Sequence, residues 1–397
     1  MVKDMPEWTP SQNRIREIDV VRGFALFGVF WMNLQQEGLT VPTDRLIFLA
    51  PPGVEKVIGF LGEWLIHGKE QALFSMLFGL GFALFLDQIS QTREDGQKLY
   101  VRRLIFLLVI GVADAVFLWI GDILNAFAMM GFLLLFTRRW PSWLLLGVGS
   151  VLSIFSVVGL IWLTGILFPH HPASWFSLDS AHAGQRFVGY QAGDYSRFVR
   201  ENARFLEAIG TLPIFAIYLL RIFGRFMLGS WMFRQAWFRA LQLGGGLPRS
   251  FVILLPVGLL MALPGPVIVA MGGHPSSVLQ QTADIVLALG YASSLILLYQ
   301  AGKIRRLLDC LGDVGRMSLT NYLFQGLFYL LVLDGFGFDL LAYVGPTFSL
   351  AMSVAFFALQ AVASRWWMSV FRFGPAEWIW RSFIYDKWLL LRRSSVC

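Results

Sequence analysis

The sequence predicts an all-α polytopic membrane protein, a bundle of about ten transmembrane helices with short interfacial or re-entrant helices. Of its 397 residues, 56% are hydrophobic and only 14% are charged, whereas soluble domains carry about 25% charged residues. The mean hydropathy is +0.63. Apolar runs close to the roughly 20 residues that cross a bilayer recur along the whole chain. No sizeable soluble domain is expected.

The candidate spans divide into an N-terminal transmembrane half (residues 18–168) and a C-terminal half (residues 212–385). The first half follows a cytoplasmic segment, residues 1–17, and the second precedes a cytoplasmic tail, residues 386–397. The spans predicted in the first half are 18–36, 71–89, 104–120, 123–136 and 143–168. Those predicted in the second half are 212–233, 251–271, 283–300, 317–333 and 343–363.

The basic residues gather in every second connection, which predicts that both termini are cytoplasmic. The net charge of +7 follows from the excess of lysine and arginine in cytoplasmic loops, so nucleic acid is not an expected partner. The clusters fall at 14–16, 93–103, 138–139, 234–249, 303–306 and from 365 onward. The predicted location is the bacterial inner (plasma) membrane.

Two segments are not predicted to span the membrane. Residues 169–211 carry several arginines and lie outside the predicted membrane. We expect this segment to form an extracytoplasmic loop or an amphipathic helix. Residues 51–69 open on a Pro-Pro-Gly breaker and are too short and polar to span alone, which predicts a re-entrant or interfacial helix. Cys310, on a predicted cytoplasmic loop, and Cys397 predict neither a disulfide framework nor a metal site.

The first predicted span carries polar residues on one face. Asp19, Arg22 and Asn33 share a helical stripe, and Gly23 and Gly28 beside it allow close helix approach. One interpretation is that Arg22 holds an anionic group such as a phosphate or carboxylate. The other is an Asp19–Arg22 pair that anchors the helix end.

Titratable residues also surround the predicted outer connections. The outer mouth of the second span carries His67, Lys69 and Glu70. One interpretation is that they are interface residues. The other is that His67 acts as a catalytic base. Asp114 and Asp122, the latter in a Gly-Asp-Ile-Leu-Asn turn, place two carboxylates where a site that polarises a hydroxyl needs them. Helix capping by Asp122 is the alternative explanation.

The sixth and ninth spans bring further polar groups into hydrocarbon. Arg221 and Arg225 stand four residues apart and require counter-anions or water; Asp114 and a ligand phosphate or carboxylate are the two partners considered. The ninth span begins after Arg316 and carries Asn321 on a polar face. This face either binds a ligand or forms hydrogen bonds with a neighbouring helix.

Near the C-terminus, Glu377 and Arg381 stand at i, i+4 among tryptophans, which predicts an ion pair on a membrane-surface anchor helix.

Several strings of residues resemble a known family. They are Arg14-Ile-Arg-Glu-Ile-Asp-Val-Val-Arg-Gly, Leu73-Phe-Ser-Met-Leu-Phe-Gly, Gly315-Arg-Met-Ser-Leu-Thr-Asn-Tyr and Gly374-Pro-Ala-Glu-Trp-Ile-Trp-Arg. They resemble the YeiB family, whose C-terminal half is domain of unknown function 418. That family looks like a branch of the transmembrane acyltransferases, similar to heparan-α-glucosaminide N-acetyltransferase.

The resemblance implies transfer of an acyl group from cytoplasmic acyl-CoA, acetyl-CoA or similar, with no metal. Asp19, Arg22 and Asn33 match the first-helix signature of those enzymes. Their catalytic histidine follows the first span, where His67 competes with Asp44, Lys69 and Glu70. The catalytic candidates are His67, Asn33, Asp122 and Glu70. The candidates for holding acyl-CoA are Asp19, Arg22, Lys69, Arg221, Arg225, Arg316 and Asn321.

Three hypotheses follow from these residues. The first is a membrane-embedded acyltransferase that moves an acyl group to a hydroxyl or amine acceptor at or across the membrane. Its expected partners are acyl-CoA, a glycan, lipid or small-molecule acceptor, membrane lipids and, as an open alternative, a second copy of the chain. The second is a transporter of an anionic solute, and the third is a catalytically inactive membrane scaffold.

Overall fold

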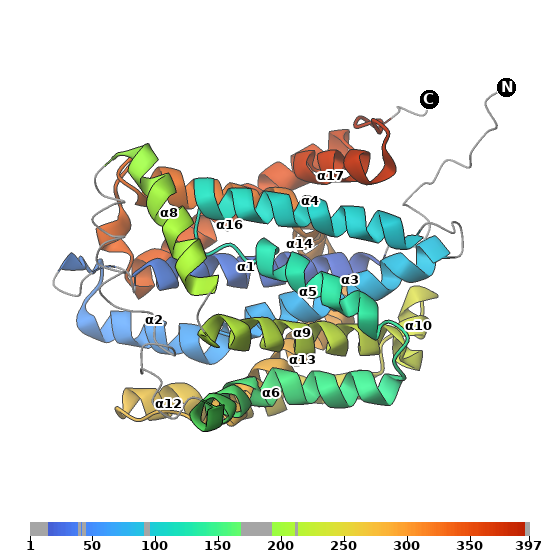
Figure 1. The fold of residues 1–397 in the computed structure, drawn as a ribbon, viewed down its shortest axis with the longest axis horizontal. Helices are drawn as coiled ribbons and strands as arrows, with labels where there is room; N and C mark the ends of the chain where they lie inside the picture. The colour runs from blue at the N-terminus through green and yellow to red at the C-terminus, as the bar shows by residue number, and fades with distance from the viewer. Residues whose placement is uncertain are drawn as a thin grey trace.

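The computed structural model describes residues 15–38, 41, 45–90, 96–167, 193–210 and 213–393. Within these ranges the chain is almost entirely helical, and its one extended pairing is an isolated bridge between Phe371 and Arg392. The longer helices run roughly along the long axis of the molecule, side by side (Figure 1). The all-α class predicted from the sequence is confirmed.

Six helical segments of the described chain are long and apolar enough to cross a membrane. They are Pro52–Ile89, Ser142–Ile166, Phe215–Phe233, Arg249–Ala270, Ser277–Ala301 and Pro346–Val370. Two shorter apolar helices cover Leu124–Thr137 and Ser318–Leu333. Two others, α1 (Arg16–Gly38) and α4 (Gly96–Phe117), reach a spanning length but carry more polar and charged residues.

The remaining elements follow in chain order. Up to residue 242 these elements are α2 (Pro52–Leu65), α3 (Lys69–Ser90), α5 (Leu124–Thr137), α6 (Ser142–Leu167), α8 (Tyr195–Gly210), α9 (Pro213–Phe233) and α10 (Ala236–Gln242). From residue 249 onward they are η3 (Arg249–Ile253), α11 (Leu254–Ala262), α12 (Pro264–Ala270), α13 (Ser277–Ala301), α14 (Arg305–Arg316), α15 (Ser318–Phe328), η4 (Tyr329–Leu333), η5 (Leu341–Tyr343), α16 (Pro346–Val370) and α17 (Pro375–Tyr385).

The structure tests the predictions for three segments that connect the spans. A helix, α2, is present within 51–69 and turns into α3 at Gly68, whose φ is +85°. The amphipathic helix predicted within 169–211 is α8, and residues 168–192 lie outside the described part of the chain. The loop predicted around Cys310 is wrong, because Cys310 lies on the amphipathic helix α14, which packs along α1.

Glycines set the closest approaches between helices. A Cβ at Gly23 would overlap the carbonyl oxygen of Leu311 on α14, and one at Gly28 would lie 2.8 Å from Cβ of Glu70 on α3. The predicted role of these two glycines is thus confirmed. A Cβ at Gly229 on α9 would overlap the carbonyl of Met76 on α3. Small residues let helix backbones approach in this way, so α3 rests directly on α9.

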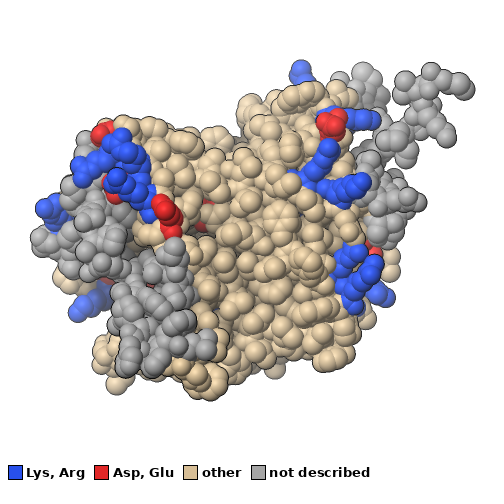
Figure 2. Space-filling view, in the orientation of Figure 1, with Lys and Arg blue, Asp and Glu red and all other residues tan. Residues whose placement is uncertain are grey.

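The surface has two charged ends and an apolar belt between them. On the face that Figure 2 shows, lysine and arginine gather over α8 at one end and at the opposite end, with few charges between. Large exposed apolar side chains fill the belt, including Trp143, Phe155 and Trp162 of α6. Since a soluble monomer rarely exposes so large an apolar surface, this belt marks a membrane protein. We name its ends the α8 end, with α2 and α12, and the α10 end (Figure 1).

Candidate functional site

A cluster of buried ionic groups lies where α3, α9 and α13 meet. Lys69 Nζ stands 3.2 Å from Asp284 Oδ1, and the side chains of both residues are only 3% exposed. Arg225, fully buried on α9, places Nη2 3.9 Å from Asp284 Oδ2. We call Lys69, Arg225 and Asp284 the buried ion cluster. Two cations share one carboxylate, so the cluster carries net positive charge.

Neutral groups supply further hydrogen bonds to the two cations of this cluster, although Arg225 Nε and Asp284 Oδ1 have no hydrogen-bond partner among the described residues. Arg225 donates from Nη1 to Gln71 Oε1 and from Nη2 to Gln281 Oε1, both at 3.0 Å. Lys69 Nζ donates to the backbone oxygens of Glu63 at 2.9 Å and His67 at 2.8 Å. The lysine thereby satisfies carbonyls that the end of α2 leaves without an intrahelical partner. The ion cluster and the α2–α3 turn therefore depend on each other.

Gly68 explains how the turn reaches Asp284. Its positive φ suits a residue without a side chain, and a Cβ there would overlap the Asp284 carboxylate. The sequence interpretation had named Lys69 and Arg225 but had missed Asp284. A single carboxylate in an otherwise apolar span was the signal that could have found it.

His67 and Glu63 form a pair beside this cluster. His67 Nδ1 and Glu63 Oε2 are 2.7 Å apart, one helical turn from each other, and their side chains are 38% and 41% exposed. A carboxylate that holds one ring nitrogen fixes the orientation of the imidazole and leaves Nε2 for a substrate. Glu63 was not predicted, although its i, i+4 spacing to His67 is visible in the sequence.

Glu70, the rival candidate base, faces inward. Its Oε2 is buried and has no hydrogen-bond partner among the described residues. A small cavity next to this region is lined by both Glu63 and Lys69 together with Asp284 and residues of α11 to α13. The structure therefore brings His67, Lys69, Glu70 and Arg225 together, as members of one site.

A second buried site holds two carboxyl groups. Asp114 and Asp122 are within hydrogen-bonding contact and are 2% and 7% exposed. Two carboxylates this close repel each other when both are ionised, and burying them together away from water is costly. The Tyr322 hydroxyl bonds Asp122 and accepts the Ile123 N–H at 3.0 Å. Asp122 Oδ2 also accepts the Asn125 N–H at 3.0 Å, which confirms its capping role.

This position of Asp114 corrects one expectation. Asp114 had been considered as the internal partner of Arg221 and Arg225, but it lies beside Asp122, and the carboxylate nearest to Arg225 is that of Asp284. Arg221 instead places its Cζ 5.8 Å from the ring centroid of Tyr218. The loop between α4 and α5 directs both carboxyl groups toward each other, which spacing in the sequence did not reveal.

Tyr218 joins the two buried sites. Its side chain hydrogen-bonds Gln71, which also binds Arg225, and it lies within electrostatic range of Asp122. Polar groups therefore extend from the buried ion cluster through Gln71 to Tyr218. Buried networks of this kind are functional candidates because each member is costly in hydrocarbon.

Asn33 lies in a separate polar group on α1. Its side chain hydrogen-bonds the Tyr329 hydroxyl. Nearby, Trp119 Nε1 donates to Glu37 Oε1 at 2.7 Å. The structure thus gives Asn33 a tyrosine partner and does not place it in contact with the His67–Glu63 pair.

Asp19 and Arg22 lie at the opposite end of α1. Arg22 Nη1 is 3.1 Å from Asp19 Oδ1, so the predicted pair is present. Arg316 lies 4.0 Å from Asp313, which also binds Arg16 at 2.7 Å. From Asp19 to Asn33 the helix rises about 21 Å. The acyl-CoA candidates therefore fall into two separate groups.

The polar face of α15 is mainly structural. Asn321 Nδ2 donates to Ser364 Oγ at 2.9 Å, and Gln325 Nε2 donates to Gln360 Oε1 at 3.2 Å. These bonds fasten α15 to α16, as the interhelical interpretation expected.

The predicted Glu377–Arg381 pair is wrong. Glu377 accepts the Leu319 N–H at 2.7 Å and the Thr320 hydroxyl at 2.5 Å, while Arg381 lies over the ring of Phe373. The carboxylate thus caps the start of α15, a role that local spacing does not indicate.

The fold and these sites define a helical membrane protein with charged groups in its interior. Residues 232–387 match a family model described as "Protein of unknown function (DUF418)". The chain is 28% identical over 407 residues to "Uncharacterized protein YxaH" of Bacillus subtilis (strain 168), covering 96% of both chains. It is 24% identical to "Uncharacterized protein YeiB" of Escherichia coli (strain K12), covering 92% of this chain and 94% of that one.

A third relative is the "Uncharacterized 39.9 kDa protein in amylase 3'region" of Bacillus acidopullulyticus, 28% identical over 94% of each chain. The chain is thus similar over nearly its whole length to YeiB-like proteins, and its C-terminal region matches the DUF418 model. No solved structure matches it. None of these names states an activity, so the similarity brings no reaction with it.

Proposed function

We propose that this protein is a membrane-embedded acyltransferase that moves an acyl group from acyl-CoA to a hydroxyl or amine acceptor. The His67–Glu63 pair carries the proposal. It combines a partly exposed imidazole, a carboxylate 2.7 Å from its Nδ1 and a buried ion cluster directly behind it. A histidine oriented by a carboxylate is the usual general base of acyl transfer.

In the proposed reaction His67 Nε2 takes the proton of the acceptor O–H or N–H as the acceptor attacks the thioester carbonyl. A new C–O or C–N bond forms and the C–S bond breaks. The imidazolium then returns its proton to the coenzyme A thiolate. Glu63 orients the ring and stabilises its charged form. The net positive buried ion cluster favours the oxyanion that forms during attack.

The proposal includes a topology of ten spans with both termini in the cytoplasm of a bacterial inner membrane. The support for this topology is that three of the predicted cytoplasmic clusters, 93–103, 138–139 and 234–249, meet at the α10 end. One residue from each cluster lines the same pocket, namely Gln97, Arg138 and Arg234. Under the positive-inside rule, these clusters support a cytoplasmic location for the α10 end. His67 and Glu63 would face the outer side, where an acceptor glycan, lipid or small molecule enters.

The test is label transfer by purified protein in liposomes, with acetyl-, succinyl- and longer acyl-CoA and an added amine or hydroxyl acceptor. We expect transfer by the wild type and a 10²- to 10⁴-fold loss with His67→Gln, the usual contribution of a general base. A smaller loss is expected with Glu63→Gln. The matched control is His274→Gln, since His274 is an exposed histidine between α12 and α13.

Two outcomes would contradict this proposal. Full activity of His67→Gln would assign the proton to another group, with Glu70 next to be tested. The absence of binding and turnover of every acyl-CoA would reject the acyltransferase. The buried arginine and lysine would then favour the transporter of an anionic solute, which flux measurements in the same liposomes would detect.

A further inference from the structure

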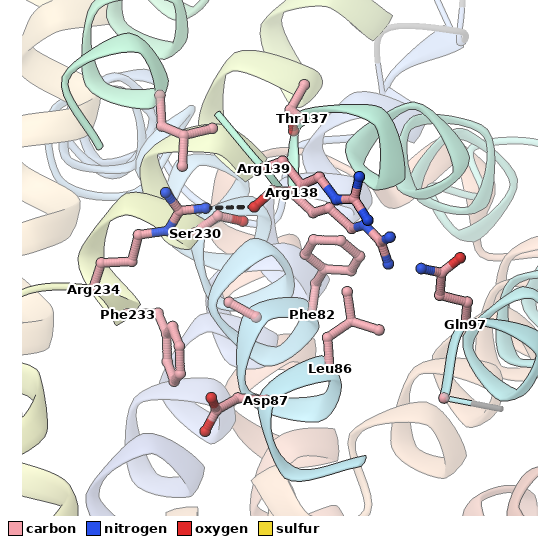
Figure 3. A pocket seen from close by; sticks show the side chains of 13 residues that line it. Phe82, Leu86, Asp87, Gln97, Thr137, Arg138, Arg139, Ser230, Phe233 and Arg234 are labelled. Atoms are coloured by element: carbon pink, nitrogen blue, oxygen red, sulfur yellow. Dashed lines mark hydrogen bonds between the residues drawn. The ribbon is translucent and has the colours of Figure 1, made fainter. Parts of the chain in front are cut away.

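A second, larger cavity lies at the α10 end, away from the residues of the proposed reaction. Its volume is about 460 Å³, and it opens to the surface between α3, α9, the start of α4 and the α5–α6 connection. None of the members of the buried ion cluster lines it, nor does His67 or Glu63. Figure 3 shows the side chains that surround it.

Three arginines give the cavity its charge. Arg138 and Arg139, at the end of α5, extend toward the side-chain amide of Gln97, which Arg138 contacts (Figure 3). Arg234, just after α9, contributes the third guanidinium. Asp87 is the single acidic residue among the described lining residues. The lining therefore has a formal net charge of two positive units.

Arg234 is held in place by neutral groups. It donates from Nη1 to the backbone oxygen of Trp140 at 2.5 Å and from Nη2 to that of Arg138 at 2.8 Å. Burial lowers the pKa of the Arg234 guanidinium, and no carboxylate among the described residues offsets that effect. Backbone carbonyls fix its position but leave its charge uncompensated, as in a prepared anion site.

The other side of the cavity is apolar. Phe82 and Leu86 of α3 face Leu145 of α6 and Phe233 of α9 across the same space. The neighbouring helix α6 contributes large exposed side chains to the apolar belt, whereas the arginines lie at the α10 end of that belt. One cavity thus combines cationic side chains with an apolar wall, a combination that suits a ligand with an anionic headgroup and an apolar part.

We propose that this cavity binds a phosphate-bearing amphiphile, with the phosphate against Arg138, Arg139 and Arg234 and the apolar part along Phe82, Leu86 and Phe233. Arginine suits phosphate because its planar group donates two parallel hydrogen bonds. Two sources share this chemistry, an anionic phospholipid and a coenzyme A thioester. The site is separate from the proposed catalytic pair, so it stands whether or not acyl transfer occurs.

The test measures binding rather than turnover. Full-length protein in phosphatidylcholine nanodiscs is titrated with palmitoyl-CoA in one arm. In the other arm, protein in nanodiscs with added phosphatidylglycerol is examined by native mass spectrometry for retained lipid. We expect the wild type to retain one of the two ligands and Arg139→Gln to bind it about tenfold more weakly, the loss expected for one charge-assisted contact. Arg139 is exposed, so this variant should fold normally.

The control is Arg239→Gln on α10, which removes an exposed arginine at the same end but outside the cavity. Its affinity should equal that of the wild type. The double variant Arg138→Gln/Arg139→Gln should abolish retention. Equal weakening by Arg239→Gln would reveal only general attraction to a basic surface and would overturn the proposal. So would failure of the wild type to bind either ligand, or equal binding by the double variant.

Discussion

Asp284→Asn tests the buried ion cluster most directly. At an effective dielectric constant of about 20, the Coulomb attraction of Asp284 is about 5 kcal/mol to Lys69 at 3.2 Å and about 4 kcal/mol to Arg225 at 3.9 Å. Part of this gain is offset by the cost of burying the charges. Removing the carboxylate leaves both cations uncompensated, and breaking a buried pair in this way typically costs about 3–5 kcal/mol.

The assay is thermal unfolding of purified protein in a mild detergent. Since 1 kcal/mol shifts Tm by about 2–4 °C in a domain of 150–250 residues, and by less in a longer chain, we expect Tm to fall by about 5–10 °C. Asparagine keeps the size and shape of the side chain, so the loss would report charge rather than packing.

The matched control is Glu201→Gln, which removes the carboxylate of an ion pair with Arg204, whose side chain is 72% exposed. Exposed pairs contribute less than about 1 kcal/mol, so the Tm should change little. If Asp284→Asn were as stable as Glu201→Gln, the carboxylate would not be needed to neutralise Lys69 and Arg225, and the reasoning would be refuted.

Two further predictions concern packing and capping. Gly229→Ala would force its Cβ into the carbonyl of Met76, so we expect a loss of about 1–3 kcal/mol. Gly147→Ala, with no atom within 4 Å of its Cβ, should be neutral or slightly stabilising in the same assay. Burial raises the pKa of Glu377 above its ordinary value of 4.5, so its contribution to stability should be full below pH 4.5 and be lost as pH rises through the raised pKa. Glu377→Gln should remove this pH dependence of Tm while keeping an acceptor for the Leu319 N–H; an unchanged pH profile would contradict this assignment.

Local patterns predicted the helical elements well. The apolar runs fell on helices, and the Asp19–Arg22 pair and the Asp122 cap formed as spacing suggested, because each joins residues within one turn. The same spacing argument also applied to Glu377 and Arg381 and was wrong there. A partner from α15, distant in the sequence, offered Glu377 two better-placed donors.

The candidate site was predicted only in part. His67, Lys69, Glu70 and Arg225 were named from the cost of polar groups in hydrocarbon, and they meet in space. Asp284 was missed although the same rule applied to it. Arg22 and Arg316 were grouped with Arg225 as ligands of one cofactor, but the structure keeps them at the other end of α1.

The sequence by itself determined that this is an all-α membrane protein, because span length and hydrophobicity are local properties that the bilayer selects. Only the tertiary structure decided that the carboxylate nearest to Arg225 is that of Asp284 and that Asp114 meets Asp122. Those choices depend on which helices become neighbours. Close contacts such as the one between Gly229 and Met76 determine which helices are neighbours. Such contacts depend on the matching shapes of segments that are distant in the sequence, so no single stretch of the chain reveals them.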